Sequence, residues 1–255
     1  MASLTNKTAL VTGASRGIGR ATASALADAG ARVLVHYGRS VQDAESLVAD
    51  IRSKGGQADA IKADLGTPDG AALLAKEVRS IVGERLDALV LNAGISKAAR
   101  IADYSVEDFD NLFAINVRSP FFLVQQLLPV LGKGSNIIVI SSIGAHAVVG
   151  KPGLDNPSIL AYASTKGALE TLVKNWAAIL GPRGIRVNAV APGVIDTDMS
   201  NFTKTEAGRE VALGMQALKR IGKPEDVADV VAFLAADAAR WITGASIPVD
   251  GGSKL

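Results

Sequence analysis

Length, composition and charge narrow the classes of protein to which this chain can belong. It has 255 residues, of which 48% are hydrophobic and 20% charged, enough to bury one large core. Its 27 basic and 25 acidic side chains are interspersed, which argues against a nucleic-acid-binding protein. Cysteine is absent, which excludes disulfides, thiolate metal sites and a cysteine nucleophile.

The chain shows no sign of a membrane segment, a leader or a second domain. No apolar run approaches the ~20 residues needed to span a bilayer, and residues 1–7 do not resemble a secretion signal. No Pro/Ser-rich linker or block of charge separates the apolar segments. We therefore expect one domain over residues 1–255, located in the cytoplasm and binding neither membrane nor nucleic acid.

Seven short apolar runs predict β-strands. Several are nearly continuous in Val, Ile, Leu and Ala instead of alternating with polar residues, which suits a parallel sheet covered on both faces. In chain order the runs cover residues 8–11, 32–36, 58–62, 88–91, 136–140, 186–190 and 246–249.

The segments between these runs have the spacing of amphipathic helices. Helices are expected at residues 20–29, 41–51, 108–131, 161–180 and 224–236. Strands that alternate with helices need crossover connections, which are almost always right-handed. The predicted fold is α/β, a doubly wound parallel sheet in a three-layer sandwich, with ligands beyond the carboxyl ends of the strands. Residues 196–219 fit short helices over a pocket, a mobile flap or a surface excursion.

A glycine-rich turn follows the first predicted strand and opens into a helix-prone segment. It reads Thr12-Gly13-Ala14-Ser15-Arg16-Gly17-Ile18-Gly19. Glycines let the backbone approach a pyrophosphate, and the free N–H groups at the helix start face its negative charge. The spacing is a variant of the dinucleotide fingerprint, and a tight turn without a ligand is the alternative.

The residues after the second predicted strand indicate which dinucleotide binds. An acidic residue there usually holds the ribose 2′-hydroxyl of NAD, but this chain reads His36-Tyr37-Gly38-Arg39-Ser40. Arg39 and Arg16 could instead pair with a 2′-phosphate, which would also offset a cation placed unfavourably at a helix start. NADP(H) is therefore the expected cofactor, with solvated surface arginines as the alternative.

Tyr162-Ala-Ser-Thr-Lys166 begins a helix-prone segment, so Tyr162 and Lys166 share one face of that helix. A free tyrosine has a pKa near ~10, and a neighbouring ammonium lowers it by favouring the phenolate. The pair could therefore act as a general acid/base, although a surface Tyr–Lys pair is the alternative. Ser141-Ser142, at the end of a predicted strand, could donate a hydrogen bond to a developing oxyanion or simply cap a turn.

These motifs, in this order, resemble the short-chain dehydrogenase/reductase family over nearly the whole chain. They comprise Thr12 to Gly19, Asn92-Ala93-Gly94, Asn116, Ser142, Tyr162 with Lys166, and Pro192-Gly193 followed by Thr197. The resemblance implies a single Rossmann-type domain in which Tyr162 is the acid/base, Lys166 lowers its pKa and binds the nicotinamide ribose, and Ser142 orients the substrate oxygen. Asn116 would hold a water that relays protons to Lys166, or would instead satisfy a backbone group.

By the same resemblance, other residues would surround the dinucleotide. Asp64 and Leu65 would contact the adenine, although Asp64 could equally cap the following turn. The full expected set is Gly13, Ser15, Arg16, Gly17, Ile18, Gly19, Tyr37, Arg39, Asp64, Leu65, Asn92, Ala93, Gly94, Tyr162, Lys166, Pro192, Gly193, Ile195 and Thr197.

Within the family, the closing run is similar to the 3-oxoacyl-carrier-protein reductases. It extends from Gly222-Lys223-Pro224-Glu225-Asp226 through Thr243-Gly244 to Asp250-Gly251-Gly252. The segment 144–161, with Lys151 to Pro157, is longer than in those enzymes and argues against a fatty-acid substrate. Family members are commonly homotetramers, with the helices around residues 113–131 and 161–180 across one interface and the C-terminal strand across another. Trp176, Leu172 and Ile179 could serve that contact or the core.

The sequence thus predicts an NADP(H)-dependent oxidoreductase that interconverts a ketone and a secondary alcohol. An NAD-linked sugar or polyol dehydrogenase is the alternative enzyme, and a nucleotide-binding scaffold or sensor is the non-enzyme alternative. No metal is expected, because His36 and His146 lack carboxylates at ligand spacing.

Overall fold

The computed structural model describes residues 3–149 and 153–253. Within these residues, seven parallel strands form one sheet in the order β3-β2-β1-β4-β5-β6-β7. The strands are β1 (Thr8–Val11), β2 (Arg32–Tyr37), β3 (Gln57–Lys62), β4 (Ala88–Leu91), β5 (Asn136–Ile140), β6 (Arg186–Pro192) and β7 (Ser246–Val249). All seven predicted runs are confirmed, and β2, β3 and β6 extend slightly beyond them.

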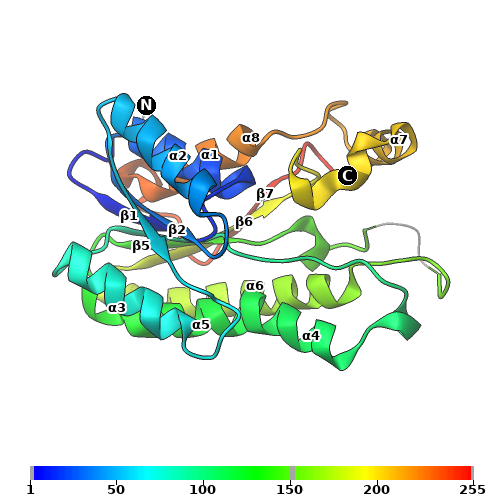
Figure 1. The fold of residues 1–255 in the computed structure, drawn as a ribbon, viewed down its shortest axis with the longest axis horizontal. Helices are drawn as coiled ribbons and strands as arrows, with labels where there is room; N and C mark the ends of the chain where they lie inside the picture. Colours follow the sequence, from blue (N-terminus) through cyan, green and yellow to red (C-terminus); the bar gives the residue numbers. More distant parts are fainter. Residues whose placement is uncertain (1–2, 150–152, 254–255) are drawn as a thin grey trace.

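Helices cover both faces of the sheet and complete the predicted doubly wound sandwich (Figure 1). On one face lie α1 (Gly17–Asp28), α2 (Val41–Ser53) and α8 (Pro224–Ala235); on the other lie α3 (Gly70–Val82), α5 (Ser119–Leu127) and α6 (Leu160–Leu180). The strand order reverses between β1 and β4, so a crevice for ligands is expected beyond these two strand ends.

The continuous apolar runs are explained by two separate cores. Successive side chains of a strand point to opposite faces, so Leu10 and Leu34 pack under α3 and α5 while Val11 and Val35 pack under α1 and α2. All four side chains are fully buried. Because both faces are covered by helices, neither face tolerates the polar alternation of a half-exposed strand.

The single helix expected over residues 108–131 is wrong in detail. The structure has α4 (Val106–Phe113), a π-helical segment (Ala114–Arg118) and α5 in succession. Pro120 explains the break, because a proline inside a helix has no N–H for the carbonyl four residues earlier, which here belongs to Asn116. The wider turn instead joins the N–H of Ser119 to the carbonyl of Ala114.

The sequence interpretation missed α3 and did not decide the structure of residues 196–219. In α3 the apolar residues Ala71, Leu74, Ala75 and Val78 are buried at helical spacing. After β6 come two short helices, η6 (Asp198–Lys204) and α7 (Glu206–Met215). The remaining short helical turns are η1 (Ile101–Asp103), η3 (Leu128–Val130), η4 (Ile143–Ala145), η5 (Gly181–Arg183) and η7 (Asp237–Ala239). None of the described helices is both long and apolar enough to cross a bilayer.

Candidate active site

The glycine turn packs directly against the end of β4. A Cβ on Gly13 would lie 2.9 Å from the Ala93 Cα, and one on Gly19 would lie 2.3 Å from the carbonyl oxygen of Gly13. Gly13 also has a φ of 63°, a conformation that favours glycine. The Asn92 side chain donates to the carbonyls of Thr12 and Gly13 at 2.9 and 3.0 Å. Asn92 and Ala93 therefore lie beside the turn.

The start of α1 is open to an anion. Arg16 is the N-cap residue, but its side chain makes no capping hydrogen bond, and the first turn contains no acidic residue. The N–H groups of a helix's first turn lack partners within the helix, and their combined dipole attracts negative charge. These features fit the pyrophosphate of a dinucleotide next to Ser15, Gly17 and Ile18.

A buried histidine holds the turn from the other side. The Gly13 N–H donates to His36 Nδ1 at 3.0 Å, and His36 Nε2 lies 3.1 Å from the carbonyl oxygen of Ala63. A carbonyl can only accept, so the proton resides on Nε2 and Nδ1 is the acceptor. Burial lowers the pKa of His36 to about 4, which keeps the ring neutral. The sequence interpretation missed this role; the signal was a histidine at the end of an apolar strand.

The two arginines expected at a 2′-phosphate differ in their surroundings. Arg16 forms an exposed ion pair with Asp198 of η6, at 3.3 Å between Nη1 and Oδ2. Arg39 is exposed, and its guanidinium makes no ion pair or hydrogen bond with any described residue. Neighbouring Tyr37 is partly buried against the α1 and α2 core. Asp64 accepts from the Gly66 N–H at 2.9 Å, which is the turn cap foreseen as the alternative, and Leu65 is buried.

Tyr162 and Lys166 come together with Ser142 at the carboxyl end of β5. Tyr162 lies in the first turn of α6, and Lys166 one turn later. The Lys166 Nζ donates to the Ile140 carbonyl at 2.8 Å and lies 5.5 Å from the centre of the Tyr162 ring. Ser142 Oγ accepts from the Gly144 N–H at 3.1 Å, and the Ser142 side chain also hydrogen-bonds Tyr162. The three side chains form one constellation.

The pKa of Tyr162 does not shift as expected. Burial raises it, and the hydrogen bond with Ser142 opposes that change only in part. The net direction is opposite to the expected lowering, because loss of hydration disfavours the phenolate more than these surroundings favour it. Burial also lowers the pKa of Lys166 to about 8. The Tyr162 hydroxyl is therefore protonated at neutral pH and can act as the proton donor.

Asn116 lies in the π-helical turn and is fully engaged with its neighbours. Its Nδ2 donates to the Ile95 carbonyl at 2.9 Å and to Thr165 Oγ1 at 3.0 Å, and its Oδ1 accepts from the Ile95 N–H at 2.9 Å. The structure therefore has the backbone-satisfying role given above as the alternative. Asn116 also lies near Lys166, because a Cβ on Gly94 would lie 3.3 Å from Asn116 Oδ1 and 3.7 Å from Lys166 Nζ.

The segment after β6 completes the site. Gly193 lies against Asp250, where a Cβ would lie 2.7 Å from the Asp250 Cα. Farther along, a Cβ on Gly17 would lie 3.3 Å from the methyl group of Thr197, so this segment returns to the glycine turn. Pro192 ends β6, and Ile195 is buried in the α1 and α8 core. The result is a continuous rim at one edge of the sheet, made of the glycine turn, the Tyr162–Lys166 pair and the segment after β6.

Comparison with known proteins identifies the family. A family model described as enoyl-(acyl carrier protein) reductase matches residues 13–254. A versicolorin reductase of Emericella nidulans is 41% identical over 98% of this chain and 96% of its own. A 3-oxoacyl-[acyl-carrier-protein] reductase of Staphylococcus epidermidis is 39% identical over 98% of this chain and 100% of its own. The crystal structure of an angucycline C-6 ketoreductase with bound NADP is similar with a TM-score of 0.90 and 40% identity, over 98% and 96% of the two chains.

The chain belongs to the short-chain dehydrogenase/reductase family. The predicted fold, family and class of oxidoreductase are thereby confirmed, with carrier-protein reductases among the relatives. Relatives that act on different substrates are similarly close, so the substrate of this reductase has to be inferred from its own site.

The buried His36 makes the folding stability of this reductase depend on pH, with lower stability in acid. Its pKa falls from 6.5 to about 4 on folding, so between these values the unfolded chain binds more protons and stability drops as the pH falls. The expected loss of unfolding free energy between pH 7 and 4 is about 3 kcal/mol from this group. Denaturant unfolding of the wild type and His36→Gln at several pH values measures it. The variant should have a flatter profile in this window, and parallel profiles would contradict the assignment.

Proposed function

We propose that this reductase converts a ring-bearing, apolar ketone to its secondary alcohol with NADPH, using Ser142, Tyr162, Lys166 and Asn116. The observation that carries the proposal is the Ser142–Tyr162–Lys166 constellation on the same rim as the glycine turn. A reacting carbonyl beyond β5 would lie between the acid group and the dinucleotide.

The proton chemistry follows from the surroundings of each group. The nicotinamide supplies the hydride when it is bound. Tyr162, which is protonated at neutral pH, donates its proton to the carbonyl oxygen, and Ser142 hydrogen-bonds the same oxygen. The Lys166 ammonium stabilises the phenolate that forms, because an opposite charge nearby favours the ionised phenol. Asn116, held by Ile95 and Thr165, fixes the backbone beside Lys166.

The proposed cofactor is NADP(H), bound by the set of residues predicted from the sequence. The supporting observations are the uncapped start of α1 and the Arg39 guanidinium after β2, which pairs with none of the described residues. A guanidinium without a protein partner is suited to grip a 2′-phosphate through two parallel hydrogen bonds. The angucycline ketoreductase has bound NADP in its crystal structure, which supports the same choice here.

The proposed substrate class rests on two segments that border the site. Val148 and Leu154 follow Ser142 along the chain, Met199 and Phe202 lie in η6 after β6, and all four are exposed. Exposed apolar side chains on the two segments that follow Ser142 and Thr197 would suit a flat apolar ring system. The names of the versicolorin and angucycline relatives favour such a substrate over a carrier-bound acyl chain. Lys151 and Pro152 of the long 144–161 segment lie outside the described residues.

The test is a panel of ketones reduced with NADPH. We expect turnover of bicyclic ketones such as 2-tetralone, with a kcat/KM at least tenfold above that for acetoacetyl-coenzyme A. Oxidation of NADPH, followed by absorbance, measures both substrates under one set of conditions. The opposite ranking would favour an acyl substrate, and NADPH binding without turnover of any ketone would favour a nucleotide-binding scaffold.

The matched control for the panel is Tyr162→Phe. It removes the proton donor but keeps the ring, so turnover should fall at least a thousandfold while NADPH affinity stays within about twofold. Fluorescence titration of NADPH separates the two effects. Retained turnover would overturn the role of Tyr162 without affecting the ranking of substrates.

Replacing Arg39 tests the 2′-phosphate assignment. Arg39→Ala should weaken NADPH by about 1.5–3 kcal/mol, the usual strength of a hydrogen bond to a charged group, and leave NADH nearly unchanged. Side-by-side titration with the two cofactors measures the difference. Equal losses for both would place Arg39 outside the phosphate site.

We also propose that the protein forms a homotetramer and that the chain acts as one functional domain. We propose a cytoplasmic location on the sequence argument alone.

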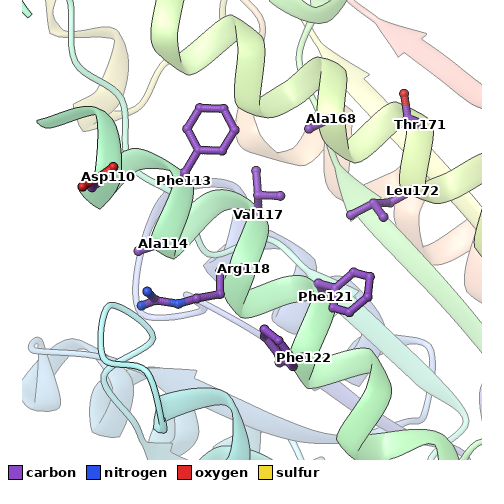
Figure 2. Close-up of a pocket in the computed structure, with 10 residues that line it drawn as sticks. All are labelled: Asp110, Phe113, Ala114, Val117, Arg118, Phe121, Phe122, Ala168, Thr171 and Leu172. Atoms are coloured by element: carbon purple, nitrogen blue, oxygen red, sulfur yellow. The ribbon is translucent and has the colours of Figure 1, made fainter. Parts of the chain in front are cut away.

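An apolar groove of about 760 Å³ lies between the 110–122 segment and α6, and Figure 2 shows Val117 and Phe121 pointing towards Leu172 across it. Phe121 and Phe122 remain partly exposed there. Trp176, by contrast, is buried in the core. A second copy that places the same helices on this groove would cover it.

Phe122→Glu should break this proposed interface. A carboxylate placed in an apolar contact loses hydration without gaining a partner, so the variant should form smaller assemblies than the wild type. Light scattering at matched concentrations measures the mass. Leu73→Glu, on the exposed face of α3, is the control that should keep the wild-type assembly, and an unchanged mass for Phe122→Glu would refute the interface.

A further inference from the structure

A buried carboxylate lies beside the acid/base pair and has no part in the reaction described so far. Glu170 is one helical turn beyond Lys166 on α6 and is only 7% exposed. A buried ionised group is costly unless hydrogen bonds and an opposite charge compensate it. Its surroundings therefore carry information about what it does.

Glu170 joins three separate segments of the site. Its Oε1 accepts from Ser246 Oγ at 2.7 Å and lies 3.3 Å from His146 Nε2. Ser246 begins the edge strand β7, and His146 directly follows η4, the turn that Ser142 caps. The carboxylate thus links the segment carrying Ser142 to the helix carrying Tyr162 and Lys166.

Lys166 has little else to balance its charge. Lys166 is 4% exposed, and the hydrogen bond of its ammonium within the described chain goes to a neutral acceptor, the Ile140 carbonyl. The titratable groups near it are Tyr162 and Glu170 on its own helix, and Glu170 in turn contacts His146 beyond η4. The strands packed under α6 place no further titratable group beside Lys166. Strands β5 and β7 contain no titratable residue, and Arg186 lies at the opposite end of β6.

We propose that Glu170 is a positioning residue: its carboxylate keeps the Lys166 ammonium charged and, through His146, holds the segment after Ser142 against α6. This inference rests on the role proposed above for Lys166. It assigns to Glu170 an electrostatic function that a neutral side chain of the same shape cannot replace.

The sign of the effect follows from the groups present. Burial lowers the pKa of Lys166 to about 8, and the negative charge of Glu170 opposes that lowering. Without the carboxylate the pKa of Lys166 falls further. Ketone reduction needs the ammonium, so its rate declines as rising pH removes the proton. The alkaline limb of the rate profile therefore reports on Glu170.

The experiment is the pH profile of kcat/KM for ketone reduction with NADPH, which reports groups of the free enzyme. In Glu170→Gln the alkaline limb should shift to lower pH by about 1 unit. This is the lower end of the pKa change that a nearby opposite charge causes. Glu170→Asp keeps the charge and should restore a limb near that of the wild type. Glu77→Gln, an exposed position on α3, is the matched control and should leave the profile unchanged.

Two results would overturn the electrostatic role of Glu170. One is a Glu170→Gln variant whose alkaline limb lies at the wild-type pH, and the other is an equal shift of that limb in Glu170→Gln and Glu170→Asp. If Glu170→Gln does not fold, Glu170→Met, uncharged and of similar volume, takes its place. Failure of the underlying function has a different signature: the wild type lacks turnover, or Lys166→Met retains it with the same alkaline limb.

Discussion

The close approach of the glycine turn to the end of β4 is the contact on which the rest of the site depends. Gly13 and Gly19 leave no room for a Cβ there, and Asn92 ties the two segments by donating to the turn's carbonyls. His36 supports the same turn from β2. A dinucleotide needs backbone N–H groups at a fixed place, and three neighbouring strands hold this turn where the strand order reverses.

Burial governs the chemistry of the polar groups around this contact. It keeps His36 neutral as a hydrogen-bond acceptor, keeps Tyr162 protonated as a donor, and moves the pKa of Lys166 towards neutrality. The three shifts share one cause, because desolvation disfavours the charged form of each group.

Prediction from the sequence succeeded where local pattern and tertiary environment agree. The strands were found because β1 and β2 are apolar on both faces, as a covered sheet demands. It failed at residues 108–131, where the apolar pattern continues through Pro120 but the hydrogen bonding does not. It also missed the acceptor role of His36 and the buried Glu170, because the hydrogen-bond partners of both residues are distant in sequence.

The sequence by itself determined the seven strands, the glycine turn, the candidate acid/base pair and the family, since these depend on residue type and spacing along the chain. Only the tertiary structure decided which way each pKa shifts, that Arg16 pairs with Asp198 while Arg39 stays unpaired, and that Glu170 joins β7 to the loop after Ser142. The physical reason is that hydration and charge pairing depend on neighbours in space, which the fold brings together from distant parts of the chain.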